Sequence, residues 1–111
     1  MNDLMTKKDA NQRFLEVLEQ GIPYFQILSD KYRQEIVVAL SEVDEMNVSS
    51  IAAKINLSRP AVSHHLKLLK HVGLIAGEKR GKEIFLKLTI GKQLKLLKEM
   101  VFLIENYCTI Q

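Results

Sequence analysis

The chain has 111 residues, of which 47% are hydrophobic and 26% are charged, so it is long and apolar enough to bury one core. No apolar run approaches the roughly 18 residues of a membrane span, and no secretion signal is evident at the N-terminus. A single cysteine, Cys108, excludes an internal disulfide framework and suits a reducing compartment. We therefore expect one cytoplasmic domain over residues 1–111, without a membrane partner.

The charge is unevenly distributed along the chain, although the net charge is only +3. Residues 1–47 carry five Lys/Arg and nine Asp/Glu, and residues 90–111 carry three and two. Residues 48–89 carry eight Lys/Arg against two Asp/Glu, a net charge of +6. A basic segment of this kind attracts polyanions, because bound phosphates release their counterions.

The first half of the chain predicts helices. Residues 7–20 form the first, ended by Gly21 before Pro23 restarts the chain. A second helix is capped by Ser29 or Asp30 and runs to about Val43. We expect these apolar positions to face a core: Phe14, Leu15, Val17, Leu18, Tyr24, Phe25, Ile27, Leu28, Tyr32, Ile36, Ala39, Leu40 and Val43. The acidic stretch 42–45 predicts a solvated loop.

Residues 49–72 predict two helices joined by a tight turn. The first, 49–55, has Ser49 as its cap, with Val48 packing ahead of it. Asn56 tolerates the left-handed backbone at its end. Either Ser58 or Arg59 caps the second helix, which begins near Pro60 and ends near Val72.

The second helix has two contrasting faces. Val62, Leu66 and Leu69 cluster on one side and must face a core. The opposite side is polar and basic, and consists of Pro60, Ser63, His64, Lys67 and His71. This pattern suits a recognition helix in the DNA major groove, although an ordinary solvated face is the alternative. His65 falls on the flank, where packing or backbone contact is as compatible with its position as base reading.

Residues 74–89 predict two strands around a turn at 79–82, because Ile84, Leu86 and Leu88 alternate with Glu83, Phe85 and Lys87 at a period of two. Arg80 and Lys82 lie at the turn. They could be solubilising charges of a plain hairpin, but their place directly after the basic helix favours a wing that contacts DNA.

The terminal helix, 91–108, is apolar over more than half its surface. One stripe is Leu94, Leu97, Val101, Ile104 and Cys108, and the stripe beside it is Leu96, Met100, Leu103 and Tyr107. Two surfaces of this kind predict that the helix packs on its own domain and on a second chain, with helix 7–20 sharing the dimer interface. The alternative is a monomer in which the N-terminal segment wraps the helix. We expect Cys108 to be a packed interface residue rather than a redox sensor.

Three stretches resemble the ArsR/SmtB family of bacterial winged-helix repressors: LSDKYRQEIVVAL (28–40), NLSRPAVSHHLKLLKHVGLI (56–75) and GEKRGKEIFLKLT (77–89). The resemblance implies a mainly α fold with a small β-hairpin, a homodimer, and repression at a palindromic operator that an effector relieves. In the family, residues matching Ser63, His64 and His65 lie at the DNA-facing part of the recognition helix. The expected DNA-binding residues are Ser58, Arg59, Ser63, His64, His65, Lys67, Arg80 and Lys82.

Two metal sites typical of the family have no counterpart in this sequence. One uses a cysteine pair near the stretch matching residues 41–50, which contains no cysteine. The other uses Asp and His on the terminal helix, but residues 91–111 contain neither. We therefore expect no metal site and no cofactor. The effector stays open between an organic compound, an oxidant, a protein partner and no ligand.

Two other functional classes compete with a transcriptional regulator. A winged-helix module could use its basic face to bind an acidic protein without specific DNA binding. An enzyme is disfavoured, because the sequence has no Gly-rich phosphate loop, no nucleophile elbow and no Cys/His pairing. Salt-sensitive duplex binding with a sequence preference separates the first alternative from the regulator.

Overall fold

The computed structural model describes residues 5–109, so the outermost residues of the predicted domain, 1–4 and 110–111, lie outside it. The chain divides into two compact units. One is residues 23–90, and the other joins the residues up to Ile22 with those from Gly91 onward. Among the described residues, no helix is both long enough and apolar enough to cross a bilayer.

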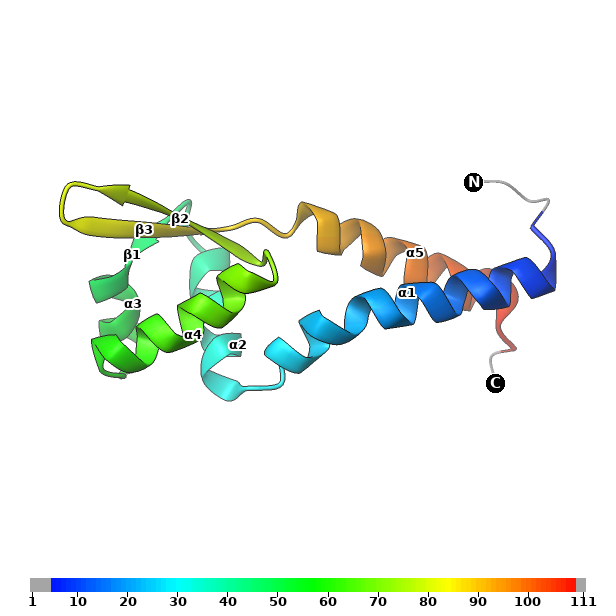
Figure 1. The fold of residues 1–111 in the computed structure, drawn as a ribbon, viewed down its shortest axis with the longest axis horizontal. Coiled ribbons are helices and arrows are strands. Elements are labelled where there is room, and N and C mark those ends of the chain that lie inside the picture. The colour runs from blue at the N-terminus through cyan, green and yellow to red at the C-terminus, as the bar shows by residue number, and fades with distance from the viewer. Residues whose placement is uncertain (1–4, 110–111) are drawn as a thin grey trace. The chain divides into compact units, whose positions relative to one another are not determined.

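The unit 23–90 is a helix-turn-helix followed by a hairpin (Figure 1). Its elements are the end of α1 (Lys7–Ile27), α2 (Lys31–Ser41), β1 (Met46–Asn47), α3 (Val48–Ile55), α4 (Arg59–His71), β2 (Ile75–Arg80) and β3 (Glu83–Leu88). Its buried core is Ile36, Leu40, Ile51, Ala52, Ile55, Val62, Leu66, Leu69, Leu74, Ile75 and Leu86. The mainly helical winged fold predicted from the sequence is therefore confirmed.

The sheet has three antiparallel strands in the order β1-β3-β2. Arg80 pairs with Glu83 across a two-residue turn, in which Gly81 has φ 63°. Glycine adopts a positive φ with the least steric strain, so the backbone conformation of the turn explains why a glycine lies at this position. Strand β1 was not predicted, because it is two residues long and shows no alternation. Met46 pairs with Leu86, which anchors the wing on the core.

Each helix of the motif begins at a polar cap. Asp30 accepts hydrogen bonds from the backbone of Tyr32 (2.8 Å) and Arg33 (3.1 Å), so it caps α2. Asn47 caps α3 through Ser50 N, so the predicted Ser49 cap is wrong and Val48 is helical. The side-chain oxygen of an asparagine can accept this capping hydrogen bond from a backbone N–H as well as a serine hydroxyl can.

The turn between α3 and α4 contains the predicted left-handed residue, and it shows which of the two candidate residues caps α4. Asn56 is left-handed, with φ 56° and ψ 50°. Ser58, not Arg59, is the cap of α4, because its hydroxyl accepts from Ala61 N and Arg59 is already helical.

Helix α1 does not end at Gly21, as the sequence predicted, but continues to Ile27 through Pro23. Because Pro23 has no backbone N–H, one helical hydrogen bond is missing there. The extra turn compensates by packing Tyr24 and Ile27 on the core of the unit 23–90. Helical spacing turns Phe25 away from that core, so it is 49% exposed and its predicted burial is wrong.

Helix α2, in contrast, is shorter than predicted, because it ends at Ser41. Val43 therefore lies beyond the cap at Glu42 and is exposed, whereas Ile36, Ala39 and Leu40 are buried as predicted. Tyr32 is only partly buried.

The second unit pairs α1 with α5 (Gly91–Tyr107). Ala10, Val17 and Leu103 are buried between them, with Leu96, Met100 and Tyr107 packed alongside. The stripe that holds Leu103 is therefore the one that packs within the chain. Leu15 and Leu18 are exposed, so the apolar side of α1 that packs on α5 is narrower than predicted.

Candidate nucleic-acid interface

Helix α4 is buried on one side and open on the other. Val62 and Leu69 are fully buried and Leu66 is 2% exposed. Ser63, His64 and Lys67 are exposed, as are Pro60 and His71. The helix thus offers a row of short polar and basic side chains on the face opposite its core contacts, as the major groove requires.

The predicted residues near the start of α4 differ in how free they are. The hydroxyl of Ser58 accepts a hydrogen bond from Ala61 N at 3.3 Å, so it is engaged as a cap. Arg59 is exposed in the first turn. Within residues 5–109, no ion pair involves Arg59, Lys67 or Lys82, so these three cations are available to phosphates.

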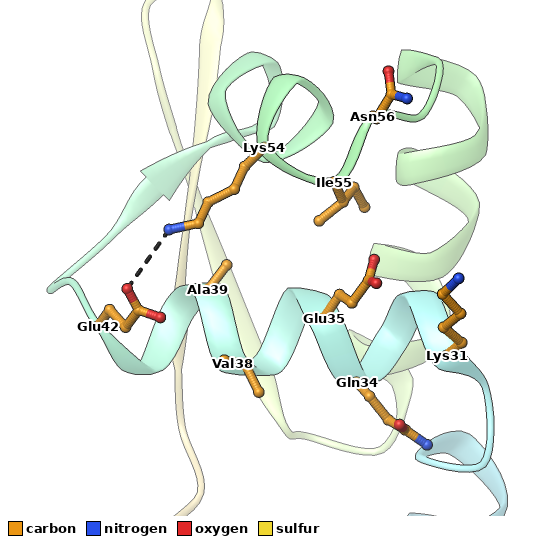
Figure 2. A pocket seen from close by; sticks show the side chains of 9 residues that line it. All are labelled: Lys31, Gln34, Glu35, Val38, Ala39, Glu42, Lys54, Ile55 and Asn56. Carbon is orange, nitrogen blue, oxygen red and sulfur yellow. Dashed lines mark ion pairs between the residues drawn. The ribbon is translucent and has the colours of Figure 1, made fainter.

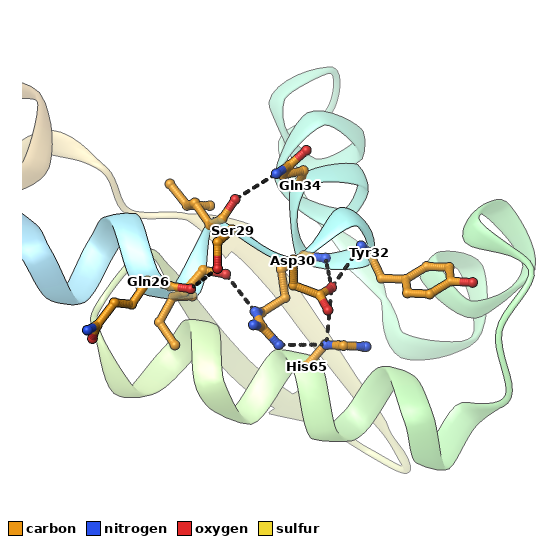
Figure 3. Close-up of polar contacts among 9 residues, drawn as sticks. Gln26, Ser29, Asp30, Tyr32, Gln34 and His65 are labelled. Carbon is orange, nitrogen blue, oxygen red and sulfur yellow. Dashed lines mark hydrogen bonds and ion pairs between the residues drawn. The ribbon is translucent and has the colours of Figure 1, made fainter.

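His65 belongs to a polar cluster rather than to the exposed row (Figure 3). Its side chain is 13% exposed, and its Nδ1 lies 3.1 Å from Nη1 of Arg33 and 3.9 Å from Oδ1 of Asp30. Its ring also lies 5.9 Å from that of Tyr32. A hydrogen bond from the Arg33 backbone amide, joined by one from Tyr32, lowers the pKa of Asp30. These contacts favour packing or backbone contact over base reading for His65.

Arg80 lies on the wing but is not a free cation. Its guanidinium bonds the carboxylate of Glu45, lies 3.7 Å from Glu78, and stacks 4.2 Å from the centre of the Phe85 ring. The bond to Arg80 lowers the pKa of Glu45 and raises that of Arg80. A phosphate must therefore compete with Glu45 for this side chain, whereas Lys82 at the turn is unengaged within the described chain.

A groove with a volume of about 540 Å³ lies between α2 and α3 on the same unit (Figure 2). Its nine lining residues include none of the predicted DNA-binding positions. Lys54 and Glu42 pair across it at 3.7 Å, and Lys31 and Glu35 also line it. Its charges balance, so the groove does not extend the basic surface.

The potential metal ligands are scattered. Within residues 5–109, no three His, Cys, Asp or Glu side chains lie close enough together to hold an ion. The three histidines are on α4, and Cys108 is a free, partly buried thiol just beyond α5.

Three residues of this surface were missed by sequence reasoning. Asp30 was expected as a cap, but its proximity to His65 was not, and neither was the contact between Arg33 and His65. Glu45 was assigned to a solvated loop. The signal for Asp30 and Arg33 was their position at a helix start, but no sequence pattern shows which tertiary partner such a side chain meets.

A capped two-helix motif with one basic open face, followed by a hairpin anchored on the core, defines a winged helix-turn-helix protein. Sequence comparison agrees with that class. The family described as bacterial regulatory protein, arsR family, matches residues 30–76. A cadmium resistance transcriptional regulatory protein, CadC homolog, from Staphylococcus aureus is 37% identical over 98 residues, which cover 87% of this chain and 77% of that protein. The chain belongs to the arsR family.

Two further relatives extend the comparison. The arsenical resistance operon repressor of Escherichia coli is 38% identical over 68 residues, or 61% of this chain and 58% of the repressor. The chain spans little more than half the length of several curated relatives, 52–58%. A homodimeric winged helix-turn-helix DNA-binding domain from Mycobacterium bovis shares the fold, with a TM-score of 0.63, 22% identity and 85% of each chain covered.

Proposed function

We propose that the protein is a homodimeric transcriptional repressor that binds a palindromic operator through α4 and the wing. The observation that carries the proposal is the open face of α4, where Ser63, His64 and Lys67 stand opposite a fully buried apolar face. Family membership supports a regulatory rather than an enzymatic role. A chromosomal target implies the bacterial cytoplasm.

In this proposal the side chains divide by task. Ser63 and His64 read base edges, because they are short and exposed on the centre of the open face. Arg59, Lys67 and Lys82 bind phosphates, which position the protein without reading sequence. Arg80 joins them only after it leaves Glu45. Ser58 acts by holding the start of α4 in place.

The dimer is proposed to form through the unpacked stripe of α5. Leu94, Leu97 and Val101 are 45%, 46% and 52% exposed, although they are large and apolar. They line a groove with Lys98, Phe102 and Glu105. Ile104 and Cys108 are partly buried at the end of the same stripe. On α1, exposed Leu15, Leu18 and Ile22 add apolar surface to this unit. The related Mycobacterium bovis domain is homodimeric, which supports a second copy of this chain as the occupant of this surface.

Operator binding is tested by fluorescence anisotropy with the DNA upstream of the protein's own gene and with a shuffled duplex, at several salt concentrations. We expect a preference of about 10³-fold or more for one site, and affinity that falls with salt. Lys67→Ala should weaken binding, whereas Lys54→Ala, which removes a cation already paired with Glu42, should leave it nearly unchanged. Equal affinity for both duplexes would overturn sequence-specific binding and favour the protein-interaction module.

We propose that derepression does not use either metal site familiar in the family, because the chain has one thiol and its three imidazoles all lie on α4. The operator complex should survive titration with zinc, cadmium, copper(I) and arsenite in a buffer free of competing thiols. Stoichiometric release that Cys108→Ser abolishes would instead identify Cys108 as the sensor. Release that persists in that variant would reveal a site built from other ligands.

A further inference from the structure

The contact between Arg33 and His65 determines which nitrogen of the imidazole carries its hydrogen. Arg33 Nη1 and His65 Nδ1 lie 3.1 Å apart, within hydrogen-bonding distance. A guanidinium has donors only, so Nδ1 must be the acceptor of this bond. A neutral imidazole that accepts at Nδ1 carries its hydrogen on Nε2. The ring is thereby fixed as a donor at its far end.

Arg33 is itself held firmly in the position that makes this contact. Its Nε donates to the backbone oxygen of Ile27 at 2.6 Å, so the side chain reaches back across the turn to the last residue of α1. Its backbone amide donates to Asp30, so the same residue is tied at both ends. Asp30 and the rings of Tyr32 and His64 also lie beside the imidazole. The last turn of α1 and the first turn of α2 thus hold the His65 side chain of α4.

The far nitrogen of His65 is left for an external acceptor. Figure 3 shows one ring nitrogen facing Asp30 and the other pointing away from it. Among residues 5–109, no hydrogen bond or ion pair engages Nε2, and the atom is not sealed from solvent. His65 lies on the flank of α4 between its buried and open faces, where a recognition helix meets the groove wall. That wall consists of phosphates.

We propose that Arg33 is a positioning residue, which fixes the Nε2–H tautomer of His65 so that this hydrogen is donated to a phosphate beside the major groove. The phosphate acceptor in this inference rests on the proposed function, whereas the tautomer of His65 does not depend on it. It gives His65 a part in DNA binding that is neither base reading nor simple packing. It also explains why a histidine on a DNA-binding helix is largely buried: the burial places Nδ1 against Arg33.

The tautomer is measured without DNA, by long-range ¹H–¹⁵N NMR of the imidazoles at pH 8.5, where histidine side chains are normally neutral. His65 should show a protonated-type Nε2 and an acceptor-type Nδ1. Arg33→Met should return it toward the mixture seen for exposed histidines, and Arg33→Lys should restore part of the bias. His71, exposed on the same helix, is the control in every spectrum. A mixed tautomer in the wild type, or no change in Arg33→Met, would overturn the proposal.

The phosphate contact is tested with two amides that imitate different ends of the ring. His65→Gln places an amide nitrogen near the Nε2 position and can keep the donor, whereas His65→Asn places it near Nδ1 and cannot. We expect His65→Asn to bind operator about tenfold more weakly per half-site with an unchanged salt slope, because a neutral donor releases no counterion, and His65→Gln to lose less. Equal behaviour of the two variants would overturn the contact while operator binding stands. A wild type that binds no duplex would refute the proposed function, and the phosphate contact with it, whatever the tautomer.

Discussion

In the proposed DNA complex, single side chains on α4 decide which sequence is preferred. The side chains of Ser63 and His64 are exposed and make no hydrogen bond among the described residues, so they can meet base edges without first breaking one. We expect Ser63→Ala and His64→Ala to reduce discrimination between operator and random duplex by about 1–3 kcal/mol each. Competition binding with the two duplexes measures this, with His71→Ala as the matched control on the same helix. An equal loss on all sequences would show that the side chain contacts phosphate instead.

One carboxylate controls the charge of the wing. Glu45 neutralises Arg80 in the free protein, so replacing it should release a cation for phosphate. We expect Glu45→Gln to strengthen binding to every duplex, and to steepen the salt slope by about 0.9 per subunit. Arg80→Ala should weaken binding less than Lys82→Ala, since only Lys82 is free at the outset. If Glu45→Gln weakens binding, the carboxylate orients Arg80 toward DNA rather than restraining it.

At the scale of elements, an ion pair joins α1 to α5. Arg13 bonds Glu99 through Nε (2.5 Å) and Nη2 (2.6 Å), and the bond to Arg13 lowers the pKa of Glu99 below its ordinary 4.5. The folded protein therefore binds this proton less readily than the unfolded chain. The stabilisation is complete above about pH 4.5 and is lost as the pH falls through the lower folded value.

Urea unfolding between pH 7 and pH 3 tests this pair. Glu99→Gln should lower the free energy of unfolding at pH 7 by about 1 kcal/mol or less, because both side chains are partly exposed. The difference from the wild type should shrink as the pH falls. If the difference in unfolding free energy between the wild type and Glu99→Gln does not change with pH, the charge of Glu99 does not stabilise the fold.

The faces of the elements could be predicted from the sequence better than their ends or their partners. Helical spacing identified the buried side of α4, and Asn56 identified its turn, whereas the cap stayed open between Ser58 and Arg59. Local patterns failed where a tertiary contact decided the outcome. Core packing of Tyr24 and Ile27 extends α1 past Pro23, and the pairing of Met46 with Leu86 creates β1. Arg33 and Glu45 lie 32 and 35 residues along the chain from His65 and Arg80, a separation that no local pattern spans.

At the scale of the whole molecule, the exposed stripe of α5 predicts a dimer. Leu97→Glu with Val101→Glu should yield monomers in sedimentation experiments, because a dimer interface would have to bury two charges from each subunit. Operator affinity should fall sharply, since two half-sites are no longer held together. Lys95→Glu, exposed on the same helix but outside the groove, is the control for added negative charge. A wild type that is monomeric at micromolar concentration would contradict this prediction.

In the proposed complex, two copies of α4 are held on two half-sites of one operator. Hydroxyl-radical footprinting of the preferred upstream site measures the spacing of the two contacts. We predict two symmetric protected patches, with centres about 10–10.5 base pairs or a multiple of that spacing apart. A single patch, or uniform protection along the duplex, would contradict binding by a symmetric dimer.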